Sequence, residues 1–402
     1  MKRIVISSFL LVVATVGVVG AQQPRSGDVA SFEFLRQLSA RDVDIEGEPL
    51  FEEFEHPDAR YAVRVFELTF QTRDADGTPV EAFASLHVPV LSTRQELPVL
   101  AFGSGTTGIG DQCAPSLEQP EVIRWGWYRQ NMNAYAGQGI VTIFPDYIGF
   151  NDPGIPQRYF SKAAEGHLML DALRAVRTVF REYRNELDTE AVLSGRSVTA
   201  GYSQGGHAAL AAADMNARYA PDVTLDGAIG FGSTNNVETL MREAGYYAPY
   251  ILYSYEHIYG NDVVNPDNIL QENWSDSLEE DVLRMCVHEF QYYYPYETAP
   301  LYTKRFQAAL TNDRLDQEFP AIKAILDENV SGLDGHGKPV LMIQGNQDII
   351  VSNQAQRAYV ARLRASGSEV ELVEMEGVRH RHTRPAGFSR SVDFVLAVTE
   401  AR

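Results

Sequence analysis

A serine stands between two glycines in residues 201–205, which read Gly-Tyr-Ser-Gln-Gly. An apolar run, 198–200, precedes this stretch, and an alanine-rich run, 208–213, follows it. The pattern predicts a strand, a sharp turn and a helix, with Ser203 at the turn and its hydroxyl lifted clear of the sheet. Glycine is needed on either side because side chains would collide in so tight a turn. We therefore interpret Ser203 as a nucleophile.

A serine hydroxyl needs a neighbouring base that takes its proton during attack. Imidazole suits this task because its pKa lies near neutrality, and a carboxylate can fix its tautomer and stabilise the imidazolium. Asp348 follows the apolar stretch 339–345, and His380 follows the stretch 369–377. Functional residues gather at the carboxyl ends of parallel strands. The order Ser203, Asp348, His380 is the one expected of an α/β-hydrolase.

Each of these assignments has an alternative. Asp348 could be a turn or capping residue. His382 lies two residues after His380, and we favour His380 because it comes directly after the predicted strand and Gly377. His207 follows Ser203 by four residues, which places it on the face of the helix as a packed residue that supports the site.

Attack on an acyl carbonyl builds negative charge on oxygen, which preorganised backbone N–H groups must meet. One donor is expected from Gln204, directly after the nucleophile. The other is expected from the glycine-rich loop 103–110, where we favour Thr106 and place Gly105 second. The loop lacks the Gly-Lys-Ser/Thr sequence of a phosphate-binding loop. The sequence predicts no cofactor and no metal site.

Strand-like and helix-like runs alternate through most of the chain. The predicted strands are 63–70, 82–88, 98–102, 139–145, 198–200, 225–231, 339–344 and 369–373. Helices are predicted over 29–38, 162–183, 355–365 and 388–398. The first two strands form a hairpin through the turn 74–77. The alternation predicts an α/β-hydrolase fold, with a mainly parallel sheet flanked by helices on both faces.

The alternation stops between residues 233 and 335. Eleven of the chain's twenty tyrosines fall between Tyr246 and Tyr302. We predict a mostly helical insertion over 233–335, and an α/β core formed by 22–232 and 336–402. The tyrosines suit either the roof of a partly wet substrate pocket or the core of a small subdomain.

The first 21 residues have the form of a secretory signal peptide. Lys2 and Arg3 precede the apolar run 4–19, and small residues end the stretch at Ala21, where cleavage is expected. A membrane anchor is the alternative, because the run is barely long enough to span a bilayer. The signal predicts a secreted or periplasmic protein without a stable membrane anchor.

Charge and cysteine content bear on partners and compartment. The 34 basic and 54 acidic residues give a formal charge of −20, which argues against nucleic acid and anionic membrane surfaces as partners. The two cysteines are Cys113 and Cys286. An oxidising compartment favours a disulfide between them, and two buried thiols are the alternative. The oligomeric state is not determined by the sequence.

Several segments together resemble the secretory lipase family of α/β-hydrolases, which includes fungal secreted lipases and bacterial secreted esterases. They are 105–108 with 113–116, 145–149, 201–206, 345–348 and 377–380. The resemblance implies a Ser-Asp-His esterase or lipase with a helical lid between the sixth and seventh strands. It also implies a disulfide from the Cys113 loop to the lid, which fits Cys286. Related bacterial sequences often have histidine where this chain has Ser104, a change that the backbone donor should survive.

Three functions follow from these observations. The leading one is a carboxylic ester hydrolase that forms an acyl-enzyme with an acyl or lipid ester. The second is a serine peptidase of the same fold, although no propeller domain or clear pair of amine-anchoring carboxylates is evident. The third is an inactive binding protein, against which the presence of all three predicted catalytic residues argues.

Overall fold

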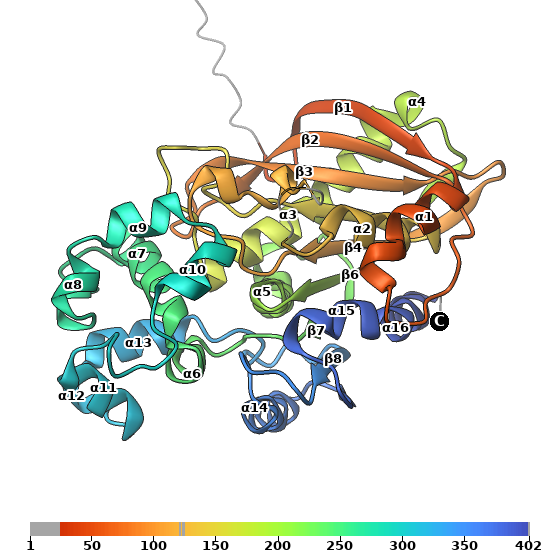
Figure 1. The fold of residues 1–402 in the computed structure, drawn as a ribbon. Helices are drawn as coiled ribbons and strands as arrows, with labels where there is room; N and C mark the ends of the chain where they lie inside the picture. Colours follow the sequence, from red (N-terminus) through yellow and green to blue (C-terminus); the bar gives the residue numbers. More distant parts are fainter. Residues whose placement is uncertain (1–24, 120–121, 123–124, 401–402) are drawn as a thin grey trace, which may run out of the picture.

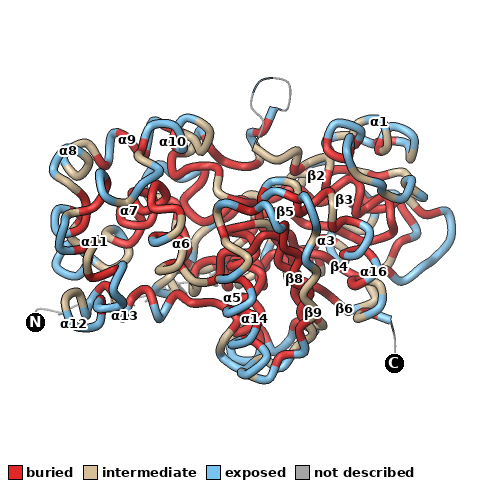
Figure 2. Tube along the Cα trace, turned by 60° about the horizontal axis from the view of Figure 1, so that its bottom comes forward, coloured by how far each residue is buried: buried red, intermediate tan, exposed pale blue. Residues whose placement is uncertain are grey.

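The computed structural model describes residues 25–119, 122 and 125–400. The predicted signal peptide, 1–21, lies outside the described residues. Among the described residues, no helix has both the length and the apolar character needed to cross a membrane. The chain folds around a nine-stranded sheet, with one group of helices beside it at the left of both views (Figures 1 and 2).

The sheet has the spatial order β1-β2-β3-β5-β4-β6-β7-β8-β9. The strands are β1 Val29–Leu38, β2 Val63–Arg73, β3 Pro79–Pro89, β4 Gln95–Gly103, β5 Val141–Pro145, β6 Ala191–Tyr202, β7 Leu225–Phe231, β8 Val340–Gly345 and β9 Val370–Met375. Strands β1, β2, β3 and β5 pair antiparallel to one another in turn, and the pairs from β5 through β4 to β9 are parallel. The predicted mainly parallel sheet is confirmed.

The first strand corrects the sequence analysis, because residues 29–38 were predicted to be a helix. They form β1, an edge strand that pairs with β2 and stacks Phe32 on Phe66 with ring centroids 4.8 Å apart. Apolar residues at Phe32, Leu35 and Leu38 are spaced by three, which imitates a helix face. Two register shifts along the pair break the alternation expected of a strand. Pairing with β2 therefore overrides the local pattern.

Helices cover both faces of the sheet (Figure 1). One face packs against α3 Lys162–Glu182, α5 Gln204–Tyr219 and α14 Asn353–Ala365. The other packs against α1 Ala40–Phe51, α2 Tyr128–Gly137 and α16 Phe388–Thr399. The short helix α4 Arg184–Leu187 follows α3, and α15 Thr383–Ala386 precedes α16. Successive residues of a strand face opposite layers, as Leu100 and Ala101 do, so the central strands are buried on both sides.

Two helices on one face carry the site. Helix α3 begins at Ser161, whose hydroxyl accepts a hydrogen bond from the Ala164 N–H at 3.3 Å. Helix α5 begins directly after Ser203, and the five alanines in its first ten residues, 208, 209 and 211–213, are buried. Small side chains let α5 lie close to both the sheet and α3, which fixes the position of its first turn.

A helical segment, which we define as Val237–Glu328, lies between β7 and β8. Its helices are α6 Val237–Glu243, α7 Ala248–Tyr259, α8 Glu272–Ser275, α9 Leu278–Arg284, α10 Val287–Tyr293, α11 Lys304–Thr311, α12 Leu315–Glu318 and α13 Pro320–Glu328. The sixth and seventh strands predicted from the sequence, between which the resemblance implies a lid, are β7 and β8 here because β1 precedes them. Most tyrosines of the segment lie in its own core, and Tyr247 of that core borders a cavity next to Ser203 together with Tyr292.

Candidate active site

Ser203 occupies a strained turn between β6 and α5. Its backbone has φ 53° and ψ −111°, a conformation that non-glycine residues rarely adopt and that costs about 1–3 kcal/mol. The turn is held on the sheet side, where the Ser203 N–H donates to the Phe231 carbonyl at 2.9 Å. It is held on the helix side by α5, which starts at Gln204. The chain therefore presents the Ser203 side chain at the carboxyl edge of the sheet.

The glycines on either side of Ser203 are required by close backbone contacts. A Cβ atom on Gly201 would lie 2.2 Å from the carbonyl carbon of Gly205. A Cβ atom on Gly205 would lie 2.0 Å from the carbonyl oxygen of Gly103, in the neighbouring strand β4. This crowding is the physical reason for the Gly-Tyr-Ser-Gln-Gly spacing.

Asp348 and His380 meet at the ends of β8 and β9. The His380 Nδ1 atom lies 2.7 Å from the Asp348 Oδ2 atom, and both side chains are buried. The Asp348 Oδ1 atom accepts hydrogen bonds from the Ile350 and Val351 N–H groups, at 2.8 and 3.0 Å. Burial acts to raise the pKa of Asp348, but His380 and these N–H groups lower it below its usual value. An ionised Asp348 would hold the proton on His380 Nδ1 and leave Nε2 to exchange protons.

Gly232, which was not predicted as a site residue, leaves space for the side chains of Asp348 and His380. It follows β7 with φ 49°, and a Cβ atom there would lie 2.9 Å from His380 Nδ1 and 3.3 Å from Asp348 Oδ2. The one signal in the sequence is a glycine directly after the apolar run 225–231. A larger residue at this position would push the His380 ring away from its carboxylate.

Ser203 and His380 border one cavity of about 810 Å³ between the sheet and the helical segment. Its lining residues are Thr106, Trp125, Tyr202, Ser203, Tyr247, Val287, His288, Gln291, Tyr292, Asn346, Gln347, Asp348, Ile349, Ile350, Arg379, His380 and Arg381. The structure thus brings four of the predicted residues, Ser203, Asp348, His380 and Thr106, to one cavity. Within the described parts of the chain, no group of three or more His, Cys, Asp or Glu residues could hold a metal ion.

The N–H groups of Gln204 and Thr106, predicted as oxyanion donors, differ from the N–H group of Gly105, which was placed second to Thr106. The Gly105 N–H donates to the Tyr128 hydroxyl at 2.7 Å, so it is already engaged. Within the described part of the chain, the N–H groups of Gln204 and Thr106 make no hydrogen bond to another protein group. The Thr106 hydroxyl lies 2.7 Å from the Tyr159 hydroxyl, which holds the loop in place. The geometry therefore favours Thr106 over Gly105.

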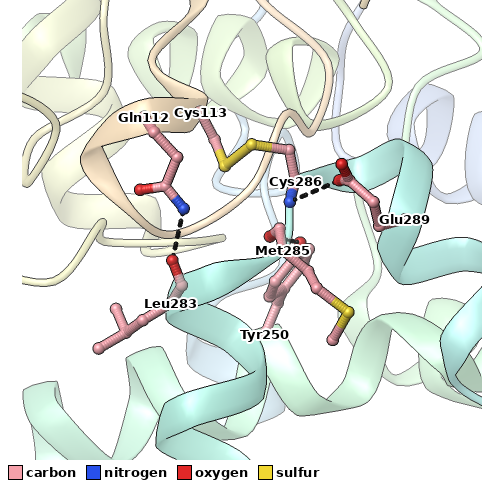
Figure 3. The surroundings of a disulfide bond; sticks show 7 residues. All are labelled: Gln112, Cys113, Tyr250, Leu283, Met285, Cys286 and Glu289. Carbon is pink, nitrogen blue, oxygen red and sulfur yellow. Dashed lines mark hydrogen bonds between the residues drawn. A yellow bond between two sulfur atoms is a disulfide. The ribbon is translucent and has the colours of Figure 1, made fainter.

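A disulfide joins Cys113, in the loop after β4, to Cys286, just before α10 (Figure 3). Two further hydrogen bonds surround it. The Gln112 side chain donates to the Leu283 carbonyl, and the Cys286 N–H donates to a carboxylate oxygen of Glu289 at 3.0 Å. The residues that follow the glycine-rich loop are thereby linked covalently to the helical segment.

The same link continues along the glycine-rich loop toward the site. The Val287 N–H donates to the Thr107 carbonyl at 2.7 Å, and Gly108 forms an isolated bridge with Cys286. Thr107 directly follows Thr106. The position of Thr106 therefore depends on the start of α10, in the helical segment, as well as on β4.

His207, predicted to be a packed residue, and His382, the alternative to His380, both lie away from Asp348. His207 is fully buried, and its Nε2 atom lies 2.7 Å from the Asn329 carbonyl. His382 borders a smaller cavity with Phe54, and burial together with the nearby Arg381 lowers its pKa below the usual value. Neither has a hydrogen bond to Asp348 among the described residues. Of the three histidines, His380 alone meets the carboxylate.

Glu165 of α3 holds the turn at Ser203 in place through hydrogen bonds. It was not predicted as a site residue from the sequence. It is 1% exposed, and its Oε1 atom accepts hydrogen bonds from the Gln204 side chain at 2.8 Å and from the Phe160 N–H at 3.1 Å. Its Oε2 atom lies 2.5 Å from His207 Nδ1. A signal existed, because Glu165 lies three residues before Leu168 on the apolar face of the predicted helix.

Replacing Glu165 with alanine is expected to lower the free energy of unfolding by about 3–5 kcal/mol. The change leaves the buried donors of Gln204, His207 and Phe160 without an acceptor. Urea unfolding followed by circular dichroism measures the effect. The control is Glu182→Ala, which removes an exposed ion pair and should cost less than about 0.5 kcal/mol. A loss below about 1 kcal/mol for the Glu165 variant would contradict the supporting role.

Two sequence comparisons both match this chain to secreted lipases. The model of the secretory lipase family matches residues 131–397, which is more than half of the chain. The secreted triacylglycerol lipase LIP5 of Malassezia furfur is 29% identical over 140 residues, a match that spans 33% of this chain and 33% of that relative.

Solved structures resemble the whole fold. A G231F mutant of the rice cell wall degrading esterase LipA from Xanthomonas oryzae has 20% identity and a TM-score of 0.74, with 94% of this chain and 100% of that chain covered. Candida antarctica lipase A in its closed state has 19% identity and a TM-score of 0.64, with 94% and 83% covered. At these identities the likeness concerns the fold, and it confirms the α/β-hydrolase fold predicted from the sequence.

Proposed function

This chain belongs to the secretory lipase family, and from that premise we propose that it is a carboxylic ester hydrolase that forms an acyl-enzyme on Ser203. The observation that carries the proposal is a strained Ser203 that borders the same cavity as the hydrogen-bonded pair His380 and Asp348. Strain of this kind persists where the surrounding structure enforces it, and it is concentrated at functional sites.

In the proposed mechanism the Ser203 Oγ atom attacks the ester carbonyl while His380 Nε2 takes the hydroxyl proton. Asp348 stabilises the resulting imidazolium. The N–H groups of Gln204 and Thr106 donate to the oxyanion of the tetrahedral intermediate. His380 then returns the proton to the leaving alcohol, and the acyl group stays on Ser203. Water attacks the acyl-enzyme with His380 as the base, which releases the acid and restores the serine.

The proposed substrate is an acyl or lipid ester bound beneath the helical segment. We propose that 233–335 acts as a cap on a core formed by 22–232 and 336–402. Support comes from Val287 and Tyr292 of α10, which line the cavity opposite Ser203. The protein is further proposed to be secreted through the signal peptide 1–21, an interpretation that the disulfide supports because such bonds persist in oxidising compartments.

Parallel assays on p-nitrophenyl esters of graded chain length and on aminoacyl p-nitroanilides test this function. We expect rapid hydrolysis of the esters and little or none of the anilides. Activity on the anilides alone would contradict the proposal in favour of a serine peptidase. A folded protein that hydrolyses neither and is not labelled by a fluorophosphonate would be an inactive binding protein.

A further inference from the structure

Two arginines stand on either side of the proposed base. Arg379 and Arg381 flank His380 in sequence, both line the large cavity, and both are exposed. Within the described part of the chain, neither side chain has a carboxylate within 4 Å or a hydrogen bond to another protein group. This is unexpected in a chain with 54 acidic and 34 basic residues.

The remaining lining of the cavity does not neutralise these two charges. Asp348 is the one carboxylate among the lining residues, and it is hydrogen-bonded to His380. Arg381 also borders the smaller cavity, where Glu52 and Glu53 lie, but neither is within ion-pair distance of it. Gln347 lines the same cavity with a neutral amide that can donate hydrogen bonds, whereas the Asn346 amide already donates to the Glu376 carboxylate.

We propose that Arg379 and Arg381 form an anion-binding subsite that makes the enzyme prefer esters carrying a carboxylate. Guanidinium groups bind carboxylates through charge-assisted hydrogen bonds, often with two parallel N–H donors. An unpaired arginine at the wall of a reaction cavity can make such bonds with a substrate without first breaking an internal ion pair. The inference rests on the proposed ester hydrolysis at Ser203.

At long range, the negative net charge of the protein opposes the binding of an anionic ester. A formal charge of −20 repels anions, but the Debye length at 0.15 M ionic strength is about 8 Å. Contacts within the cavity are shorter than this length, so they are screened much less. The preference for anionic esters should therefore be measured at about 0.15 M salt, where the repulsion is suppressed.

The test compares kcat/KM for matched pairs of charged and neutral esters. One pair places the carboxylate on the acyl side: the mono(4-nitrophenyl) ester of adipic acid and its terminal amide. The other places it on the alcohol side: 4-acetoxybenzoate and 4-acetoxybenzamide. In at least one pair we expect the carboxylate to be preferred about tenfold or more, and the pair that shows the preference locates the subsite.

The variants Arg379→Gln and Arg381→Gln are expected to lower that preference about threefold each, and about tenfold together. Arg379→Lys and Arg381→Lys, which keep the charge, should retain part of it. The matched control is Arg357→Gln, which removes an exposed arginine paired with Glu374 outside the cavity and should leave the preference unchanged. Both cavity arginines are exposed, so equal melting temperatures are expected for all variants.

The possible results distinguish failure of the proposed subsite from failure of the proposed function. Equal hydrolysis of charged and neutral esters, or a carboxylate preference that the double glutamine variant retains, overturns the subsite while ester hydrolysis stands. Failure to hydrolyse any ester in either pair or in the p-nitrophenyl series overturns both. A preference that falls in the glutamine variants and survives in Arg357→Gln supports the subsite.

Discussion

Replacing Ser203 with alanine is expected to lower kcat by about four to six orders of magnitude and to leave the fold intact. The change removes the oxygen atom that is proposed to form the acyl-enzyme. Alanine has the same backbone restrictions as serine, so the strained φ of 53° is neither relieved nor increased. Steady-state hydrolysis of a p-nitrophenyl ester and mass spectrometry of the protein during turnover measure the two effects. The acylated mass should occur in the wild type alone.

A second serine provides the control for this variant. Ser389 is exposed at the start of α16, away from the cavity, and Ser389→Ala should retain full activity. If the Ser203 variant keeps activity within tenfold of the wild type and still becomes acylated, another group is the nucleophile. That result would remove the basis of the proposed mechanism.

Replacing His380 with alanine is expected to lower kcat by about four orders of magnitude or more, whereas His382→Ala should stay within about threefold of the wild type. Of these two histidines, His380 is the one that lies 2.7 Å from Asp348 and borders the cavity with Ser203. His382 lies beside Phe54 in the smaller cavity. The comparison is informative because the two residues share a short 3-10 turn and differ in position by two.

The rate of fluorophosphonate labelling measures the same difference without a substrate. Labelling needs the base as well as Ser203, so it should slow sharply in the His380 variant and be nearly unchanged in the His382 variant. The reverse pattern would move the role of base to His382. Circular dichroism of both variants would show whether the turn remains folded.

The parts of the site that could be predicted from the sequence lie at the ends of predicted strands. Ser203 and Asp348 follow buried apolar runs, His380 follows the edge strand β9, and parallel strands bring their carboxyl ends to one edge of the sheet. The local sequence pattern and the rule for the carboxyl ends of parallel strands were therefore enough to group residues that lie more than 140 positions apart in the chain. Gly201 was predictable because its clash with Gly205 is local to the turn, whereas the contact of Gly205 with Gly103 comes from the neighbouring strand β4.

The parts that could not be predicted depend on contacts between distant segments. The Gly105 N–H is engaged by Tyr128, and no pattern in the sequence indicates which tyrosine hydroxyl reaches it. Gly232 is needed because His380 approaches it from β9, two strands away in the sheet. The helix predicted over 29–38 was wrong for the same reason, since β2 determines the conformation of β1.

The disulfide divides the chain into a closed ring and two open tails. The ring runs from Cys113 to Cys286, a separation of 173 residues, so it contains Ser203 but neither Asp348 nor His380. In the chain-entropy model, closing a ring of this size stabilises the folded state by about 5 kcal/mol, because the unfolded chain is restricted. The carboxyl-terminal tail has no such restriction, and its strands β8 and β9 end the sheet. When the protein unfolds partially, we therefore expect β8 and β9, with Asp348 and His380, to separate from the sheet. Ser203 should stay in the part of the chain that the disulfide closes.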